Sequence, residues 1–191
     1  MKKRSCAPFL CVLLLSLCLS AGAAAQEGQN DTQWAEGSLG YLVAYSESDF
    51  SFTSYRNADV LQSLAPPPAD DYPIVFVSVS HLTDITMEDA MDSLRSQSGV
   101  NGTLFQGELS GHPTLEYHFA QGEQPNSRVC EYTMVQKSDG SLLLIEMDFY
   151  PALDQNVKDR LYAVRDSITP LDEGESASRV QAGSSGSTTS R

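Results

Sequence analysis

The sequence contains few of the residues on which catalytic and metal centres commonly depend. Its 191 residues include three histidines, one tryptophan and four cysteines. It has no glycine-rich phosphate loop, no Gly-x-Ser-x-Gly nucleophile turn, no His-Glu-x-x-His zinc helix and no Cys-x-x-Cys pair. Ser80 and His81 are adjacent, so in a strand they point to opposite faces and cannot act as nucleophile and base. We therefore predict that the protein is not an enzyme.

Long apolar runs are also absent, except near the N-terminus. Residues 1–25 begin with three basic residues, continue with an apolar run over about residues 9–19 and end in three alanines. A run of this length is too short to span a bilayer, and the order of the three parts is typical of a secretory signal peptide. We predict cleavage near Ala25 and a periplasmic or secreted protein with no integral membrane span.

Cysteine is scarce beyond the signal peptide. Cys6, Cys11 and Cys18 lie within it, which leaves Cys130 alone in the exported chain. No intramolecular disulfide can then form, and a thiolate zinc site is disfavoured. A lipid anchor at Cys18 is a less favoured alternative to cleavage, because Leu17 stands where lipoprotein signals carry a small residue.

Basic residues are far outnumbered by acidic ones. The chain has 12 Lys and Arg against 25 Asp and Glu, a net charge of −13. Removal of residues 1–25 takes away three cations and no acid, which leaves nine against 25 and a net charge of −16. Contacts to phosphates need cations, so nucleic acids and anionic membrane surfaces are excluded as partners. The acidity fits either solubility in the exported compartment or capture of cations or basic partners.

The exported chain divides into one domain with a polar segment at each end. Residues 26–38 are polar and show no periodicity, so we predict a flexible tether there. Residues 172–191 are rich in Ser, Gly and Thr and are predicted to be disordered. Residues 39–171 have the right length for a single domain with its own core.

The pattern of residues 39–171 predicts an α+β fold, a mostly antiparallel β-sheet with two amphipathic helices packed on it. Strands are expected over residues 39–45, 50–55, 74–79, 103–108 and 115–120, and a proline-rich loop over 56–72. Thr86 can cap the start of a helix over residues 86–98, and Gly99 can end it. The second helix is predicted to start at Pro151 and to end at Pro170, with an apolar stripe that includes Leu161.

The best-specified element is a hairpin over residues 128–150. Its Asp139-Gly140 dipeptide lies between two apolar runs, which is typical of a two-residue type I′ turn. Counting outward from that turn places Cys130 opposite Phe149 on an apolar face and Glu131 opposite Asp148 on the other face. Cys130 is therefore predicted to be a small buried hydrophobe.

An acidic surface follows from this register if the strand over residues 115–120 shares the same core face. The five candidate metal ligands that are then placed together are Glu116, His118, Glu131, Glu146 and Asp148. Carboxylate oxygens and an imidazole can hold a divalent cation, which would also offset the repulsion between acids on paired strands. The alternatives are a solvated sheet face, or one that is salt-bridged to Lys158 or Arg165 of the second helix.

The order of these elements resembles that of a known superfamily. The similarity includes a helix that opens with Thr86-Met87-Glu88-Asp89 and a strand-turn-strand over residues 107–117 that contains Ser110-Gly111-His112-Pro113. These features resemble the PsbP/Mog-type α/β sandwich, and the export signal points to its DcrB-like bacterial envelope branch. The resemblance implies a binding or assembly role with another envelope protein as partner. It implies no catalytic residue, because the family has no catalytic motif.

Three functions remain open at this point. The first is an exported, acidic, non-enzymatic binding or assembly module of the bacterial envelope. An alternative is a carrier of a small ligand or divalent cation that uses the acidic sheet face. A second alternative is a hydrolase of unrecognised type. No cofactor is expected apart from the divalent cation of the carrier.

Overall fold

The structure, a computed structural model, describes residues 31–171. The signal peptide predicted over residues 1–25 and the tail predicted over residues 172–191 lie outside the described residues. Ten strands and two helices form between residues 31 and 171. Neither of these helices is long and apolar enough to cross a membrane.

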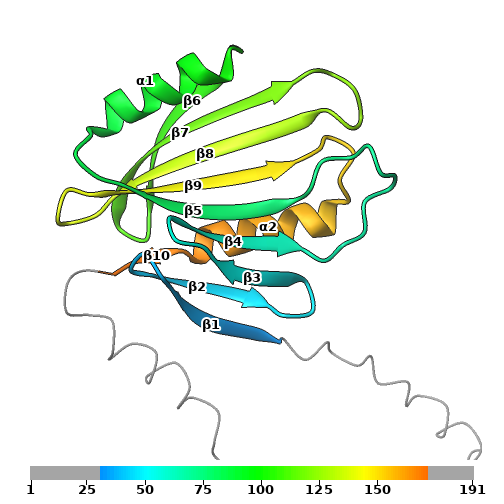
Figure 1. Ribbon diagram of the computed structural model, residues 1–191, viewed down its shortest axis with the longest axis horizontal. Helices are drawn as coiled ribbons and strands as arrows, with labels where there is room; N and C mark the ends of the chain where they lie inside the picture. Colours follow the sequence, from blue (N-terminus) through cyan, green and yellow to red (C-terminus); the bar gives the residue numbers. More distant parts are fainter. Residues whose placement is uncertain (1–30, 172–191) are drawn as a thin grey trace, which may run out of the picture. The chain divides into compact units, whose positions relative to one another are not determined.

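The strands form two antiparallel sheets (Figure 1). The smaller sheet has the order β1–β2–β10, with β1 (Thr32–Gly37), β2 (Tyr41–Ser46) and β10 (Thr169–Pro170). The larger sheet has the order β3–β4–β5–β9–β8–β7–β6. Its strands are β3 (Phe50–Ser54), β4 (Ala58–Ser63), β5 (Phe76–Leu82), β6 (Thr103–Leu109), β7 (His112–Gln121), β8 (Arg128–Gln136) and β9 (Leu142–Phe149).

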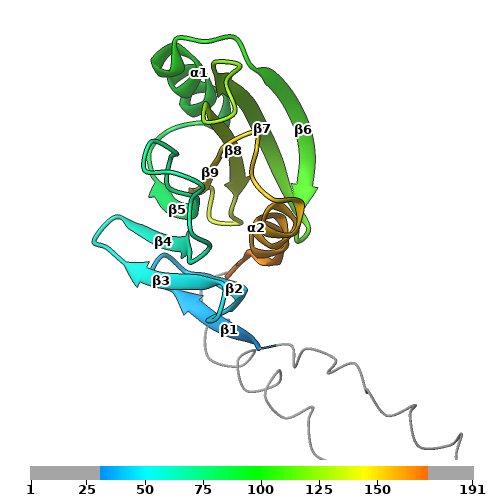
Figure 2. The same cartoon turned by 90° about the vertical axis from the view of Figure 1, so that its right-hand side faces the viewer.

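Each face of the larger sheet contacts one helix, so the predicted α+β class is confirmed. The helix α1 (Met87–Ser98) packs on β7 and β8, whereas α2 (Gln155–Ser167) packs on β5 and β9 and also contacts β2. Figure 2 shows the two helices separated by the strands of this sheet. We call the side of the sheet under α1 the α1 face and the side under α2 the α2 face.

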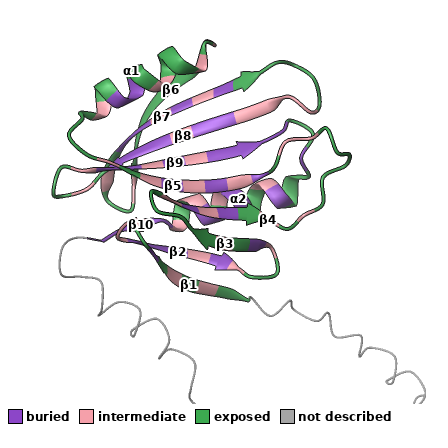
Figure 3. Ribbon diagram, viewed as in Figure 1, coloured by how far each residue is buried: buried purple, intermediate pink, exposed green. Residues whose placement is uncertain are grey.

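Each face has its own apolar core. The core on the α2 face includes Val77, Ile145 and Leu161, and it extends to β2. The core on the α1 face includes Met91 from α1 and Tyr117 and Met134 from the sheet. The central strands carry most of the buried residues, while β6 at the end of the sheet is exposed along nearly its whole length (Figure 3).

The two helices begin at capping residues. Thr86 caps α1, because its hydroxyl accepts a hydrogen bond from the Asp89 N–H at 3.1 Å, and Gly99 ends α1 with a φ of 64°. The helix predicted over residues 86–98 is thus confirmed. The second helix begins later than predicted, at Gln155 rather than at Pro151, because the carboxylate of Asp154 accepts from the Asn156 N–H at 2.9 Å. Leu161 in its apolar stripe is fully buried.

Three strands lie where the sequence pattern predicts none, and the shortest is β10, at the predicted end of the second helix. The tether predicted over residues 26–38 contains β1, and the loop predicted over residues 56–72 contains β4. Most β1 side chains are exposed or half-buried, so its sequence shows little periodicity, and the strand forms because β2 pairs with its backbone.

A buried carboxylate joins the two sheets. Asp59 of β4 is fully buried and accepts hydrogen bonds from the Ser38 N–H at 2.8 Å, the Ser38 hydroxyl at 2.8 Å and the Tyr41 hydroxyl at 2.9 Å. Burial and the adjacent carboxylate raise the pKa of Tyr41, so its hydroxyl remains a donor. Buried charges are stable only when they are paired or hydrogen-bonded, and these three donors satisfy that requirement.

The β8–β9 hairpin forms as predicted, but its register is wrong by one residue. Its loop contains three residues, because Lys137 N–H donates to the Ser141 carbonyl at 2.9 Å and Gly140 N–H donates to the Lys137 carbonyl at 3.0 Å. Gly140 has a φ of 86°, and Asp139 has no positive φ, so the turn is not type I′. Cys130 therefore pairs with Asp148 rather than with Phe149.

Candidate functional site

The corrected register divides the five predicted metal ligands between the two faces of the sheet. Glu116, His118 and Glu131 lie on the α2 face, where His118 pairs with Glu131. Glu131 is paired with Met147, so these two residues share the α2 face. Side chains alternate along β9, so Glu146 and Asp148, on either side of Met147, lie on the α1 face. The expectation of a single acidic face is therefore wrong. Between residues 31 and 171, no three His, Cys, Asp or Glu side chains are grouped so that they could hold a metal ion.

The α2-face group connects α2 to the sheet. Tyr162 donates a hydrogen bond to Glu131 Oε1 at 2.8 Å, and Arg165 Nη1 lies 3.8 Å from Glu131 Oε2. His118 Nε2 lies 3.2 Å from Glu116 Oε2 and 3.8 Å from Glu131 Oε2. The hydrogen bond to His118, assisted by the charge of Arg165, lowers the pKa of Glu116. This group matches the alternative in which a helix cation neutralises the acids.

The α1-face group is neutralised by a different cation. Arg128 Nε donates to both carboxylate oxygens of Asp148, at 2.7 and 2.6 Å, and Arg128 Nη2 lies 3.1 Å from Glu146 Oε1. Tyr132 donates to the same Glu146 oxygen at 3.3 Å. Burial and the charge of Asp148 raise the pKa of Glu146, and burial is the larger cause. The sequence pattern predicted a helix cation as the partner rather than Arg128, although Arg128 lies two residues before Cys130 and so shares its face.

Cys130 is buried beside Asp148, as expected for a structural cysteine. Its Sγ lies 3.5 Å from Asp148 Oδ1. Burial, with a further contribution from the charge of Asp148, raises the pKa of the Cys130 thiol to about 12. The thiol therefore remains protonated at neutral pH, and a protonated thiol is a poor nucleophile and metal ligand.

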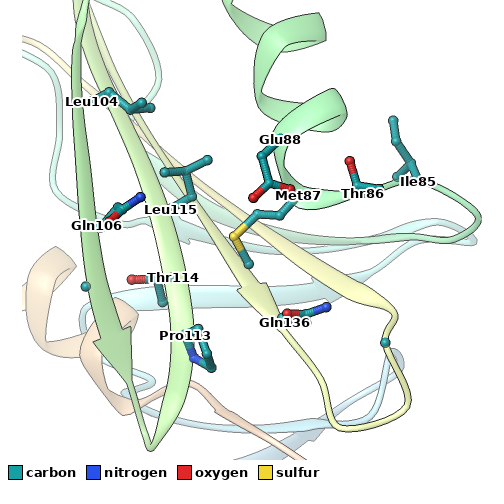
Figure 4. Close-up of a pocket in the computed structure, with 12 residues that line it drawn as sticks. Ile85, Thr86, Met87, Glu88, Leu104, Gln106, Pro113, Thr114, Leu115 and Gln136 are labelled. Carbon is teal, nitrogen blue, oxygen red and sulfur yellow. The ribbon is translucent and has the colours of Figure 1, made fainter.

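A groove lies on the α1 face between α1 and the exposed end of the sheet (Figure 4). It has a volume of about 650 Å³. Figure 4 shows Met87 and Glu88 reaching from α1 toward Leu115 of β7. The residues that line the groove are Ile85, Thr86, Met87, Glu88, Leu104, Gln106, Gly107, Pro113, Thr114, Leu115, Gln136 and Gly140. Glu88 is the only charged residue among them, so the lining is mixed apolar and polar with one negative charge.

Large apolar side chains are exposed at this groove and on the strand beside it. Leu104 is 45% exposed and Ile85 38% exposed, and Phe105 on the other face of β6 is 46% exposed. Leu104 and Ile85 share the groove, and exposed apolar groups at one surface are typical of interaction sites. Sequence reasoning placed a strand here but missed the groove. The available signal was the run Thr103-Leu104-Phe105, in which adjacent apolar residues must point to both faces of a strand.

The comparisons with known proteins concern the fold. No protein-family model matches the chain, and no curated protein matches its sequence. The solution structure of cyanobacterial PsbP (CyanoP) from Synechocystis sp. PCC 6803 matches with a TM-score of 0.51 and 14% identity, over 79% of this chain and 99% of that one. The chain has a PsbP-like fold. The predicted fold resemblance is thus confirmed, and at this level of identity the similarity does not extend to individual residues.

Other solved structures with weaker similarity to this PsbP-like chain come from bacteria. PA94 from Pseudomonas aeruginosa, a protein of unknown function, has a TM-score of 0.49 at 9% identity and covers 74% of this chain and 98% of its own. LpqN, which is involved in cell envelope biogenesis of Mycobacterium tuberculosis, has a TM-score of 0.48 at 14% identity and covers 73% of this chain and 91% of its own.

Proposed function

We propose that this protein is an exported, acidic, non-enzymatic binding or assembly module of the bacterial envelope, and that its partner protein docks at the groove between α1 and β6. The observation that carries the proposal is the exposure of Ile85 and Leu104 at the rim of this groove. Apolar side chains on such a surface gain free energy when a partner removes them from water, at about 25 cal/mol per Å² buried.

The ionic groups of the sheet support a binding role over a chemical one. Glu131 is held by Tyr162 and Arg165, and Asp148 is held by Arg128. These contacts connect the helix and the strands, although Glu131 Oε2 itself accepts no hydrogen bond from the described residues, and neither acid lines the groove. The five residues predicted to bind a divalent cation lie on two faces of the sheet, so they do not favour one shared cation site.

Export is part of the proposal and rests on the N-terminal pattern of three basic residues, an apolar run and three alanines. Expression of the full chain in a bacterium, followed by N-terminal sequencing of the protein from the periplasm, tests it. The expected N-terminus is Gln26. Recovery of the uncleaved chain from the cytoplasm would contradict this part of the proposal.

A photo-crosslinking experiment tests the docking site. A photoreactive phenylalanine analogue is placed at Leu104, and in a control chain at Tyr55, which is 62% exposed and lies between β3 and β4. Both chains are irradiated in envelope extract and their adducts are identified by mass spectrometry. We expect one protein to be enriched at Leu104 and to be displaced by unlabelled wild-type chain. Equal adducts at the two positions, or no specific adduct at Leu104, would refute the proposed site.

A further inference from the structure

We propose that the partner binds as an extended segment that adds a strand to the outer edge of β6 and places a basic and an apolar side chain, four residues apart, on the α1 face. This inference rests on the proposed function and specifies the chemistry of its partner. The starting observation is that β6 is the last strand of the seven-stranded sheet. Among the described residues, no backbone hydrogen bond outside the β6–β7 ladder involves residues 103–109.

The turn between β6 and β7 determines which backbone groups face outward. Ser110 and Gly111 have φ values of 52° and 84°, as in a two-residue type I′ turn, and Leu109 pairs with His112 across it. Residues that flank such a turn form a hydrogen-bonded pair, and hydrogen-bonded positions alternate along an antiparallel ladder. Leu109 and the residues at two-residue intervals before it bond to β7, so the residues between them direct their N–H and C=O groups away from β7. These residues are Leu104, Gln106 and Glu108.

The same three residues direct their side chains to the α1 face, where the groove lies. Gln106 pairs with Leu115, which belongs to the core of that face, and both Leu104 and Gln106 line the groove. A strand added to β6 would place its side chains directly opposite these three, within contact distance. The backbone edge and the groove thus form one continuous surface for an extended segment.

Glu108 is the only charged residue of β6, and the strand has no other feature that discourages pairing of its outer edge. Edge strands that must not pair usually carry lysine, proline or a bulge. The seven residues of β6 include no lysine and no proline, and none of them has a positive φ. Strand addition is a common mode of peptide recognition, in which the main chain supplies affinity and alternate side chains supply specificity.

The charges around the edge select a basic segment. Glu108 is one of the three β6 residues whose backbone N–H and C=O groups face outward. Glu88 lines the groove, and no lysine, arginine or histidine is among the lining residues. A lysine or arginine opposite Glu108 would form a favourable cross-strand pair, and an apolar residue would fit opposite Leu104. A second copy of this chain would instead bring its own Glu108 and Glu88 to the same surface. The occupant is therefore a segment of a different protein.

Direct binding of synthetic peptides to the wild-type chain tests the mode of recognition. The probe is a fluorescein-labelled threonine-based peptide with one lysine and one valine four residues apart, so that both lie on the same face of a strand; its binding is measured by fluorescence anisotropy. The matched probes have glutamate in place of lysine, or N-methyl groups at alternate residues that block one backbone edge. We expect the lysine–valine peptide to bind about tenfold or more tightly than either, because the glutamate peptide loses the cross-strand charge pair and the N-methylated peptide loses backbone hydrogen bonds. Absence of binding by the lysine–valine peptide would overturn the inference.

Variants of β6 provide the complementary test. Gln106→Pro removes an outward N–H, whereas Gln106→Ala keeps it, and proline is tolerated on an edge strand where the N–H faces solvent. We expect Gln106→Pro to weaken binding of the peptide about tenfold relative to Gln106→Ala. Glu108→Lys should reverse the preference between the lysine and glutamate peptides. Equal affinity for all these variants would overturn strand addition. If Gln106→Pro does not fold, the N-methylated peptide alone decides.

The remaining outcomes separate this inference from the proposed function. Loss of peptide binding with a retained Leu104 crosslink leaves the groove as the docking site and refutes strand addition. A wild-type dimer that Gln106→Pro dissociates, measured by sedimentation, would identify a second copy as the occupant and overturn the choice of partner. Binding that appears only when residues 172–191 are deleted would identify the chain's own C-terminal segment as the occupant, with the same consequence.

Discussion

The buried carboxylate of Asp59 provides a sharp test of how the two sheets are joined. Tyr41→Phe deletes one of its three hydrogen bonds, the 2.9 Å bond from the Tyr41 hydroxyl, and leaves the ring in place. A hydrogen bond to a charged group contributes about 1.5–3 kcal/mol, and Asp59 has no access to water that could replace the lost donor. We therefore expect the free energy of unfolding to fall by about 2 kcal/mol.

Urea denaturation followed by circular dichroism measures this loss. With a slope of roughly 2 kcal/mol per molar urea, the midpoint should fall by about 1 M. The matched control is Tyr45→Phe, whose hydroxyl accepts a hydrogen bond from Gln33 in a partly buried site between uncharged groups. That change should cost about 0.5–1.5 kcal/mol. If Tyr41→Phe costs no more than Tyr45→Phe, the charged network does not hold the sheets together as argued.

The same comparison has a predicted dependence on pH. The pKa of Tyr41 is raised in the folded state, so its contribution is fully present below the pKa of an unfolded tyrosine, near 10, and is lost as the pH rises through the folded pKa. Wild-type protein should therefore lose stability above about pH 10, whereas Tyr41→Phe lacks this contribution. The difference in free energy of unfolding between wild type and Tyr41→Phe is expected to narrow above about pH 10. A constant difference up to pH 11, roughly one pH unit above the unfolded pKa, would contradict the assigned cause.

Three further substitutions test the two faces. Leu161→Asp buries an unpaired charge in the apolar stripe of α2 and should lower the free energy of unfolding by more than about 4 kcal/mol, enough to abolish the thermal melting transition of the domain. The control Ala163→Asp, at an exposed position of the same helix, should change the free energy of unfolding little. The pKa of Glu146 is raised in the folded state, so its contribution to stability is present below the unfolded carboxyl pKa, near 4.3, and is lost as the pH rises through the folded value. Glu146→Gln should therefore gain stability relative to wild type as the pH rises above about 4. The pKa of Glu116 is lowered in the folded state, so its contribution to stability is present above the unfolded pKa and is lost as the pH falls through the folded value. Glu116→Gln should therefore reduce the loss of stability at acidic pH, and an unchanged loss would contradict this.

Elements that depend on local chemistry could be predicted from the sequence. The helix α1 follows from the cap at Thr86, the apolar spacing and the stop at Gly99, all of which act within a few residues. The burial of Leu161 and Cys130 follows from periodicity in the same way. The strand β1 could not be predicted, since its stability comes from pairing with β2 rather than from its own side chains.

The candidate site depended on one local choice that the sequence does not decide. An Asp-Gly dipeptide fits both a two-residue turn and a three-residue loop in which only the glycine has a positive φ. The structure takes the second form, and Asp139 stabilises it by accepting hydrogen bonds from the Ser141 N–H at 2.8 Å and the Ser141 hydroxyl at 2.6 Å. This difference of one residue moved Glu146 and Asp148 to the other face. The run Leu104-Phe105 indicates apolar residues on both faces of β6, but the groove itself could not be predicted because it depends on where α1 packs.

The ion pairs on the two faces have a consequence for how the hairpin folds to a single register. Near the turn, Val135, Leu142, Leu143 and Ile145 are all buried, so apolar side chains occupy both faces and a shifted pairing would still bury them. The polar residues at the far end distinguish the two pairings, because Arg128 of β8 and Asp148 of β9 share a face only when Cys130 pairs with Asp148. The ion pair between Arg128 and Asp148 therefore favours one register of the hairpin, as a buried asparagine does in a coiled coil. Replacement of these two residues by apolar ones should leave a stable hairpin that samples two registers.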